Sequence, residues 1–345
     1  ATEMTPRVLI AGASFAGLAA ARALGPRAML LDRAPLGAGV TSACGAPVSI
    51  VEHMGAGDSI LQRHDRLIID VEGRGVVWPL PEPFCTFDYG EFCRLAFAGS
   101  GAVFEQASVQ AVQGDRVATT AGDLPASFII DATGPRSRLT SPARRRRVAF
   151  GIETEILAPP ADGLLFYFLP EVRDGYAWAF PCGATTRFGV LSYFGKTKLM
   201  PALVTFLRRF GLEPAGIHGG YLATGWQPAV SGNVFVAGDA AGQCLPLTGE
   251  GIRTAVLAGE RVGVLLRGVL EGRWSQEQAT SRYRAFVARE RRRYRALLWG
   301  TAAVLAMPRP LLRLAAAALA RPLPLSWFLR RYLSIFSRSP ADQAA

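Results

Sequence analysis

The sequence predicts an α/β fold: a lobe built on a parallel, Rossmann-like sheet, an antiparallel-sheet domain beside it, and a helical C-terminal tail. Three features of the 345-residue chain lead to this prediction. A glycine-rich turn joins a short buried strand to a helix near the N-terminus. A second strand–turn–helix pattern follows near residue 240. After about residue 271 the chain consists of arginine-rich and apolar segments with helical character.

Composition narrows the class of protein. Half of the residues are hydrophobic and the mean hydropathy is +0.21, so the chain can form a large core. The formal net charge is +11, and arginine carries almost all of the positive charge, because Lys196 and Lys198 are the only lysines. Such a charge suits nucleic acid, an anionic membrane surface or an anionic ligand. We expect no nucleic acid, since no motif that reads it accompanies the charge.

Cysteine usage and the N-terminus indicate the compartment. The five cysteines are odd in number and show no CxxC spacing, so we expect neither a disulfide scaffold nor a metal site. No charged-then-apolar signal pattern precedes the first motif. These features predict a cytoplasmic protein. His53, His64 and His218 fall in no motif, and we expect them in structural or surface positions.

The first motif is RVLIAGASFAGLAAARAL. It predicts a buried strand over Val8–Ala11, a glycine turn, and a helix from about Ala16. The turn follows the pattern G-x-G-x-x-G with Ser14 in place of the second glycine. Gly12 permits the tight turn, Gly17 lets the helix pack closely on the strand, and the helix N-terminus offers N–H groups to a pyrophosphate. The predicted cofactor contacts are Gly12, Ala13, Ser14, Phe15, Ala16 and Gly17.

A second strand, AMLLD, ends at Asp32 and is followed by Arg33. An acidic side chain at this point can accept hydrogen bonds from the ribose hydroxyls of an adenosine. A glycine pattern alone is weak evidence of a site. Strand, turn, helix, strand and terminal acid together predict a Rossmann-like dinucleotide site that includes Asp32 and Arg33.

The second motif, NVFVAGDAAGQCLPLTGEGI, ends at Ile252. It predicts a buried strand over 234–237 and a loop that opens a helix at Ile252. Asp239, at the carboxyl end of that strand, can accept a ribityl hydroxyl, and the amides at the helix start can face the carbonyls of a flavin. The residues assigned to this part of the site are Gly238, Asp239, Pro246, Gly249, Gly251 and Ile252.

With IIDATGPRS at 129–137, these motifs resemble the FAD lobe of flavoprotein monooxygenases and their reductase relatives. Four pieces resemble the geranylgeranyl reductase family more closely: Cys44-Gly45, GIETEI from residue 151, GYAWAFP from residue 175, and DAAGQCLPLTGEGI. The resemblance covers about residues 6–270. It implies FAD as the cofactor, with Gly45 among the cofactor contacts. One departure is Tyr89, where relatives usually carry an arginine that helps to hold the cofactor; Arg33 and Arg136 are the candidates to replace it.

Aromatic side chains recur at every second position of GYAWAFP and of LLFYFLP. Alternate side chains of a strand line one face, so the spacing by itself is compatible with a core plug or with a cavity wall. The resemblance implies that they wall a cavity beside the flavin. Such a wall suits a polyprenyl chain, a quinone ring or another fused aromatic. The substrate-binding residues implied are Phe166, Phe168, Tyr176, Trp178, Phe180 and Pro181.

Cys44 is the catalytic candidate. The family places a cysteine near the isoalloxazine, where a thiol can donate a proton after hydride leaves the flavin or can tune the position of the substrate. Packing as a small buried residue is the alternative.

The arginine run at 144–147 is interpreted as a solvated loop or as a docking patch for a membrane or an acidic electron donor.

The resemblance implies a flavin-dependent reductase that saturates carbon–carbon double bonds of an isoprenoid chain. A monooxygenase or epoxidase on a hydrophobic substrate shares the FAD lobe and is the alternative. A halogenase is disfavoured, because that reaction resembles one that needs a lysine between the glycine turn and the aromatic strand, and no lysine precedes Lys196. A non-catalytic, membrane-attached FAD-binding protein is a further alternative. With a single dinucleotide fingerprint, the electron donor is left open between NAD(P)H and a ferredoxin-like protein.

We expect the FAD-binding domain to combine residues 1–45, 100–145 and 228–270, the substrate domain to combine 46–99 and 146–227, and a helical region to cover 271–345. The longest uncharged run in the tail, Ala296–Pro308, has 13 residues, fewer than the ~20 needed to cross a bilayer. Six arginines and one acid lie beyond residue 300. This balance predicts a tail that lies on an anionic membrane surface, while a helical cap on the FAD lobe would give the same apolar pattern.

Overall fold

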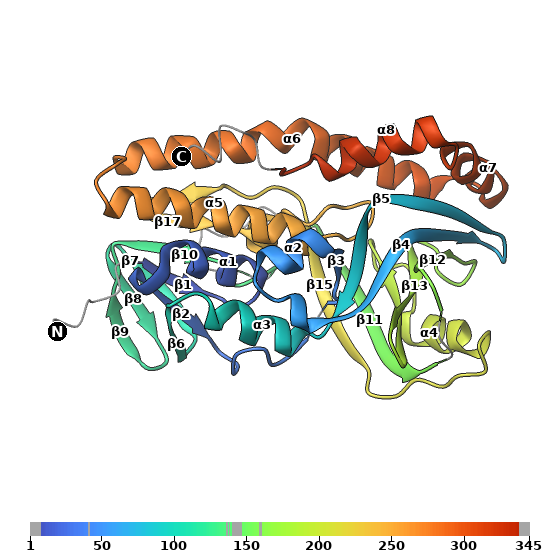
Figure 1. The fold of residues 1–345 in the computed structure, drawn as a ribbon, viewed down its shortest axis with the longest axis horizontal. Coiled ribbons are helices and arrows are strands. Elements are labelled where there is room, and N and C mark those ends of the chain that lie inside the picture. The colour runs from blue at the N-terminus through green and yellow to red at the C-terminus, as the bar shows by residue number, and fades with distance from the viewer. Residues whose placement is uncertain are drawn as a thin grey trace.

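A computed structural model of the chain describes residues 8–40, 42–135, 137, 139, 147–158 and 161–337. Within these residues the strands form three sheets, and a layer of helices runs along one side of the two larger ones (Figure 1). The sequence-based candidates Arg136 and the arginines at 144–146 lie outside the described residues.

The first sheet carries both nucleotide motifs. Its strands, in spatial order, are β16 (Val230–Ser231), β17 (Val234–Val236), β10 (Phe128–Asp131), β1 (Val8–Ala11), β2 (Ala28–Asp32) and β6 (Val103–Gln106). Neighbours pair in parallel, except for β16 with β17. The carboxyl ends of β1, β10 and β17 therefore meet at one edge, as ligand sites on open parallel sheets require. A small meander of β7 (Val109–Gln113), β8 (Arg116–Thr119) and β9 (Gly122–Pro125) extends this lobe.

Helix α1 (Phe15–Leu24) lies against α5 (Ile252–Leu270) on this sheet. The close approach depends on a glycine of α5: a Cβ on Gly259 would lie 2.0 Å from the Ala16 carbonyl oxygen. Helix α3 (Tyr89–Ala98), which the predicted domain bounds assign to the substrate domain, packs against α1 through a ring contact between Phe15 and Phe92. The bounds themselves remain a prediction.

The second sheet forms the other lobe. Its strands, in spatial order, are β15 (His218–Thr224), β11 (Arg147–Leu157), β14 (Thr185–Ser192), β13 (Gly175–Cys182), β12 (Leu164–Phe168), β4 (Ile60–Val71), β5 (Gly75–Phe87) and β3 (Gly45–Pro47). The predicted antiparallel sheet is confirmed with one exception, because β12 and β4 run in parallel. Helix α4 (Leu199–Arg208) packs its buried face on β14 and β11, and α2 (Val48–His53) follows β3.

The tail consists of α6 (Gln276–Ala306), α7 (Arg309–Leu319) and α8 (Pro322–Leu333), as the proline-broken pattern predicts. A capping box at Ser275 begins α6, which lies on α5. Helix α7 contacts β4 and α8 contacts β5, both in the second sheet, so together with α6 on α5 the tail reaches both lobes (Figure 1). The indole N–H of Trp78 on β5 donates to the Ala316 carbonyl at 3.2 Å. No helix in the described residues is both long enough and apolar enough to cross a bilayer.

Candidate active site

A cavity of about 1350 Å³ lies where the two larger sheets and the tail meet. The glycine turns and the loop before α5 line its nucleotide end, the eight-stranded sheet forms one wall, and the tail forms the other. Its nucleotide end includes Gly12, Ser14, Phe15, Ala16, Asp32, Arg33, Gly45, Gly238, Asp239, Gly249, Gly251 and Ile252. Its sheet wall includes Glu153, Phe166, Phe168, Tyr176, Trp178, Phe180 and His218, and its tail wall includes Leu312, Ala316, Leu319, Phe328, Leu329 and Tyr332.

The first glycine turn is built for close backbone packing. Gly12 has φ of 107°, and a Cβ there would lie 2.2 Å from the Ala132 carbonyl oxygen. A Cβ on Gly17 would lie 1.8 Å from the Gly12 carbonyl oxygen. Neither Gly17 nor Ala13 is among the cavity-lining residues, so their contribution is to the shape of the turn. The Ala13 N–H donates to the Asp32 carboxylate at 2.8 Å, which ties the turn to the end of β2.

Two further carboxylates stand at the same sheet edge. Asp131 is fully buried and accepts from the N–H and hydroxyl of Thr133 and from the hydroxyl of Ser137, which holds the turn after β10. Asp239 faces the cavity at the end of β17. Burial raises the pKa of Asp239 to about 7, while a hydrogen bond from the Ala223 N–H acts in the opposite direction.

These residues fit FAD. Neither α1 nor α5 has a side-chain cap at its N-terminus, and both N-termini line the cavity, so first-turn N–H groups are available to a pyrophosphate and to flavin carbonyls. The desolvated Asp239 carboxyl has a place for hydroxyl donors of a ribityl chain. If FAD binds, Gly12, Asp32 and Asp239 would hold its phosphate and sugar groups, and the flavin would supply hydride chemistry.

The aromatic residues of β13 and β12 pack on one another and also line the cavity. Tyr176, Trp178 and Phe180 are each no more than 9% exposed. The Phe166 ring centroid lies 5.4 Å from that of Tyr176 and 5.3 Å from that of Phe180. Tyr176 also donates its hydroxyl to the Thr248 carbonyl at 2.6 Å, which joins this wall to the loop before α5.

Besides Ala13 and Gly17, two more predicted site residues, Pro181 and Pro246, do not line the cavity. The Pro181 carbonyl accepts from the Thr86 hydroxyl at 2.6 Å, and the Pro246 carbonyl accepts from the Tyr193 hydroxyl. Both prolines therefore support the wall from behind. Strand β12 pairs with β13 only at Ala177–Ala179. Pro181 lies beyond this pairing, so β12 has no backbone hydrogen bond that the missing N–H of Pro181 would have to make.

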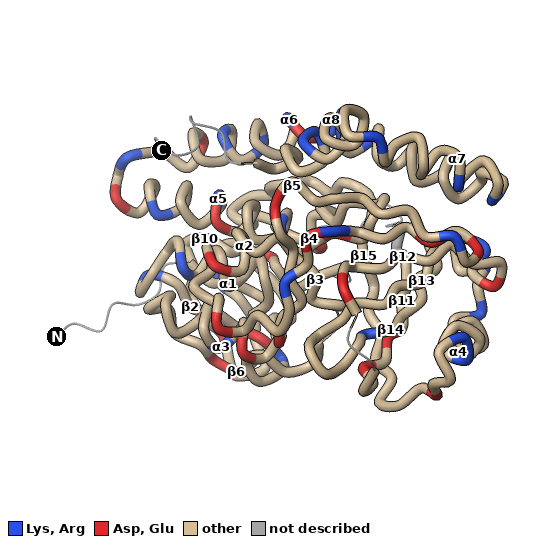
Figure 2. The backbone as a smooth tube through the Cα atoms, turned by 45° about the vertical axis from the view of Figure 1, so that its right-hand side comes forward, with Lys and Arg blue, Asp and Glu red and all other residues tan. Residues whose placement is uncertain are grey.

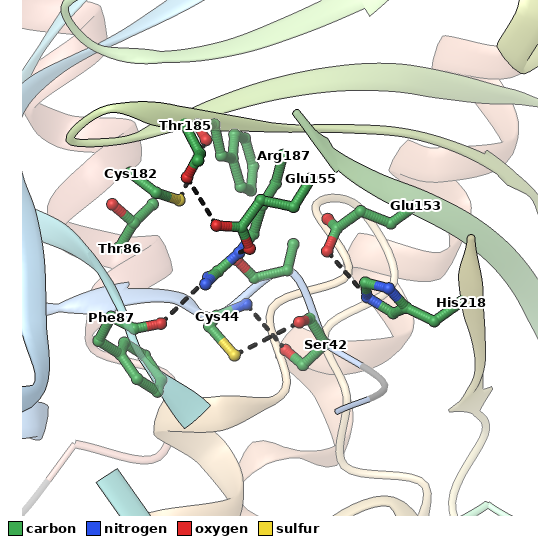
Figure 3. A network of polar contacts seen from close by, with 12 residues as sticks. Ser42, Cys44, Thr86, Phe87, Glu153, Glu155, Cys182, Thr185, Arg187 and His218 are labelled. Carbon is green, nitrogen blue, oxygen red and sulfur yellow. Dashed lines mark hydrogen bonds and ion pairs between the residues drawn. The ribbon is translucent and has the colours of Figure 1, made fainter. Parts of the chain in front are cut away.

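The loop that carries Cys44 is held against the sheet by Arg187 (Figure 3). The guanidinium is buried and donates to the carbonyls of Ala43 and Phe87 at 3.2 and 3.0 Å, and to the Glu155 carboxylate at 2.9 Å. Cys44 has φ of 50° and its thiol donates to the Ser42 carbonyl at 3.3 Å. Burial raises the pKa of the Cys44 thiol above its usual value, and the charge of Arg187 only partly opposes this. The thiol in the cavity wall is therefore neutral.

Sequence interpretation missed Glu153 and placed His218 among structural or surface residues. The structure puts both in the cavity wall, where the His218 ring nitrogen Nε2 lies 3.1 Å from Glu153 Oε1 (Figure 3). The signal for Glu153 is present in GIETEI, in which Gly151, Glu153 and Glu155 alternate and so share one face of β11. No local signal marks His218, because its place depends on pairing between β11 and β15.

No family model matches the chain. Over 107 residues it is 34% identical to a digeranylgeranylglycerophospholipid reductase of Methanococcus aeolicus, a match that spans 28% of this chain and 27% of that protein. A geranylgeranyl bacteriochlorophyll reductase-like protein from Thermoplasma acidophilum has a similar fold, with TM-score 0.82, 18% identity, and coverage of 96% of this chain and 97% of that one. A probable FAD-dependent monooxygenase from Pseudomonas aeruginosa matches with TM-score 0.66, 19% identity, and coverage of 96% and 99%.

These findings confirm the predicted fold class and the predicted resemblance to geranylgeranyl reductases. The sequence match covers about a quarter of the curated relative, and the structural matches below 25% identity establish the fold.

Proposed function

We propose that the protein is a flavin-dependent oxidoreductase that reduces carbon–carbon double bonds of an isoprenoid, geranylgeranyl-type or similar lipophilic substrate. The observation that carries this proposal is the continuity of one cavity, from the glycine turns to an aromatic and aliphatic chamber. Its volume of about 1350 Å³ exceeds the ~300–1000 Å³ typical of a site for one small ligand. A dinucleotide cofactor and part of a lipid chain can share it.

The chain's own residues supply binding, orientation and water exclusion. Phe166, Trp178 and Phe180 form an apolar aromatic wall for an alkene, and Leu312 and Leu329 of the tail line the same cavity. Cys44 and Gly45 border the same space, where the neutral thiol can contact the substrate and tune its position. Bound flavin would supply the hydride. The donor that reduces the flavin is NAD(P)H or a ferredoxin-like protein.

The alternative is a monooxygenase or epoxidase acting on a hydrophobic substrate, which the similarity in fold to a probable FAD-dependent monooxygenase favours. A non-catalytic FAD-binding protein would need no chamber beyond its cofactor, and the cavity volume argues against it.

We also propose that the tail rests on an anionic membrane surface, from which a lipid substrate enters. Several large apolar side chains of the tail face outward, with exposed fractions of 75% for Trp299, 64% for Leu314, 83% for Leu323 and 58% for Trp327. Helices α7 and α8 are therefore apolar on two sides: one side lines the cavity, and the other carries Leu314, Leu323 and Trp327. A bilayer would cover the outer side.

Charge on the same helices supports this membrane proposal. From residue 278 to 337 the one acidic residue is Glu290, which is buried between Arg289 and Arg293. Figure 2 shows basic residues along α6, α7 and α8. The exposed arginines are Arg282, Arg284, Arg289, Arg291, Arg292, Arg293, Arg295, Arg321, Arg330 and Arg331. Such a surface attracts anionic lipid.

All five cysteines are free and buried, which supports the proposed cytoplasmic location.

The test of the proposed reaction is the mass of the product. FAD-loaded protein is reduced with dithionite under anaerobic conditions and mixed with a geranylgeranyl lipid. We expect each reduced double bond to add two hydrogens and no oxygen. Product that gains oxygen in air, with nothing formed anaerobically, would establish the monooxygenase instead.

A further inference from the structure

A single row of residues crosses four strands of the eight-stranded sheet on its cavity face. Trp178 of β13 pairs with Gly189 of β14, Gly189 pairs with Glu153 of β11, and Glu153 pairs with His218 of β15. A Cβ on Gly189 would lie 2.1 Å from the Trp178 ring. Because Gly189 has no side chain, the Trp178 indole can lie across it and reach Glu153.

This row holds the Glu153 carboxylate from both sides. The Trp178 indole N–H donates to Glu153 Oε2 at 2.7 Å, and His218 Nε2 lies 3.1 Å from Glu153 Oε1. The Glu153 side chain is 4% exposed and that of His218 is 28% exposed. The Glu153 carboxylate is thus enclosed in the cavity wall, whereas the His218 imidazole reaches water.

The pair is chemically distinct from its surroundings. Among the described residues that the eight-stranded sheet contributes to the lining, the others are apolar, glycine or tyrosine. An ion pair in an apolar wall is costly to maintain unless its charges are well partnered. Its position beside an aromatic face, with a route to water, is the arrangement expected of a proton donor.

We propose that the Glu153–His218 pair supplies the proton that accompanies hydride transfer to the substrate, an inference that rests on the proposed reductase function. One alkene carbon gains the hydride, and with it two electrons, from the reduced flavin. The other carbon gains the proton that Glu153 and His218 share. The double bond is lost, two C–H bonds form, and the pair is left as a carboxylate beside a neutral imidazole. Water then returns a proton at the exposed edge of His218. Trp178 positions the carboxylate.

The electrostatics of the pair agree with this role. The hydrogen bond to Glu153 raises the pKa of His218, burial lowers it, and the Glu153 charge and a hydrogen bond to the Gly216 backbone raise it further; Arg187 of β14 acts in the lowering direction. Glu155, also on β11, is ion-paired with Arg187. The net effect is a raised pKa, so the imidazolium persists to higher pH than that of a free histidine. Burial raises the pKa of the Cys44 thiol, which makes it the weaker acid of the two candidates.

The test compares His218→Gln, Glu153→Gln and the matched control His53→Gln. His53 lies 3.1 Å from Glu260, the same separation as His218 from Glu153, but it does not line the cavity. Each protein is loaded with FAD, reduced with dithionite, and mixed anaerobically with a geranylgeranyl lipid while flavin oxidation is followed from pH 5.5 to 9. Wild type and His53→Gln should show a rate that falls as pH rises through the raised pKa of His218. His218→Gln and Glu153→Gln should be at least ~100-fold slower and lose that pH dependence.

A second readout does not depend on turnover. In ¹⁵N spectra of the wild type, the Trp178 indole resonance, assigned with Trp178→Phe, should shift with the titration of His218, and the shift should vanish in His218→Gln. A wild type that reduces the lipid, with a His218→Gln variant of equal rate and equal pH profile, overturns the proton role alone. Loss of the pH dependence in Cys44→Ser, with its retention in His218→Gln, also overturns it and assigns the proton to the thiol. A wild type that reduces no isoprenoid alkene removes the proposed reaction and this role together.

Discussion

The hydroxyl of Tyr89 donates a hydrogen bond to the hydroxyl of Ser14 at 3.1 Å. Ser14 replaces the second glycine of the fingerprint and is the N-cap of α1, while Tyr89 begins α3 and stands where the sequence resemblance implies an arginine. The two departures from the expected motifs therefore contact each other. The Tyr89 ring also packs edge-on against Phe15, with 5.7 Å between the ring centroids. We infer that the pair fixes the glycine turn to α3 at the nucleotide end of the cavity.

The Tyr89–Ser14 contact should appear as an energetic coupling. We expect Tyr89→Phe and Ser14→Ala each to lower the free energy of unfolding, and the double variant to lose less than their sum, with a coupling of about 0.5–1.5 kcal/mol. Denaturant unfolding of the four proteins measures it. Strict additivity would show that the hydrogen bond contributes nothing.

Gly17→Ala should abolish FAD binding. The new Cβ would sit 1.8 Å from the Gly12 carbonyl oxygen, so α1 must move off the strand and its N-terminus must leave the cavity. Gly57→Ala is the matched control, because its Cβ would meet the nearest atom at an ordinary 3.7 Å. FAD released on denaturation, per mole of protein, is the measurement. Normal FAD content in Gly17→Ala would contradict the assigned role of the turn.

Asp239 should contribute a loss of stability to the FAD-free protein as pH rises from about 4 to 7. Because the pKa of Asp239 is raised to about 7 when folded, the native state binds more protons than the unfolded state within this window. The free energy of unfolding therefore falls with pH, by at most ~1.4 kcal/mol per pH unit from this group. Asp239→Asn should remove that slope, whereas Asp115→Asn, at an exposed position, should keep it. Unfolding at pH 5 and 7 compares the three proteins, and an unchanged slope in Asp239→Asn would refute the assignment.

Cys44→Ser should reduce catalytic efficiency, kcat/KM, more than stability. The hydroxyl can keep the donation to Ser42 but is smaller than the thiol, so contact with the substrate should weaken and KM should rise several-fold. Cys85→Ser, which is equally buried but does not line the cavity, is the control. Steady-state kinetics and thermal unfolding separate the effects. Unchanged kinetics in Cys44→Ser would leave Cys44 with a packing role only.

The tail should bind anionic liposomes and release them at high salt. Its exposed arginines supply a screened attraction, and its exposed apolar side chains supply burial in the interface. Replacement of both Leu323 and Trp327 by Asp should lower the bound fraction at least ~tenfold, while Leu157→Asp, 74% exposed on β11, should not. Flotation at low and high salt measures the effect. Full-length protein that stays at the bottom under both conditions would leave the tail as a cap alone.

Local chemistry was enough to predict the nucleotide lobe from the sequence. Strand β1, the Gly12 turn, strand β2 with its terminal Asp32, and the start of α5 at Ile252 occur as predicted, within a residue or two. Each of these features is encoded within about thirty residues, by apolar runs, by glycines that alone tolerate the backbone approach, and by acids at strand ends. The same local patterns carried the resemblance to the FAD lobe of flavoprotein monooxygenases, while Cys44-Gly45, GIETEI, GYAWAFP and DAAGQCLPLTGEGI carried the closer resemblance to the geranylgeranyl reductases.

Only the tertiary structure decided what surrounds the cavity. Glu153 and His218 are 65 residues apart in the chain, and their contact depends on the register of β11 against β15. Trp178 reaches Glu153 because a glycine of a third strand lies between them. The apolar pattern of the tail was compatible with a cap or a membrane surface; folding places Leu312 and Ala316 toward the cavity and Leu314 and Leu323 outward. Periodicity specifies that a helix has an apolar face, but the partner of that face is set by packing between segments distant in sequence, which no local pattern encodes.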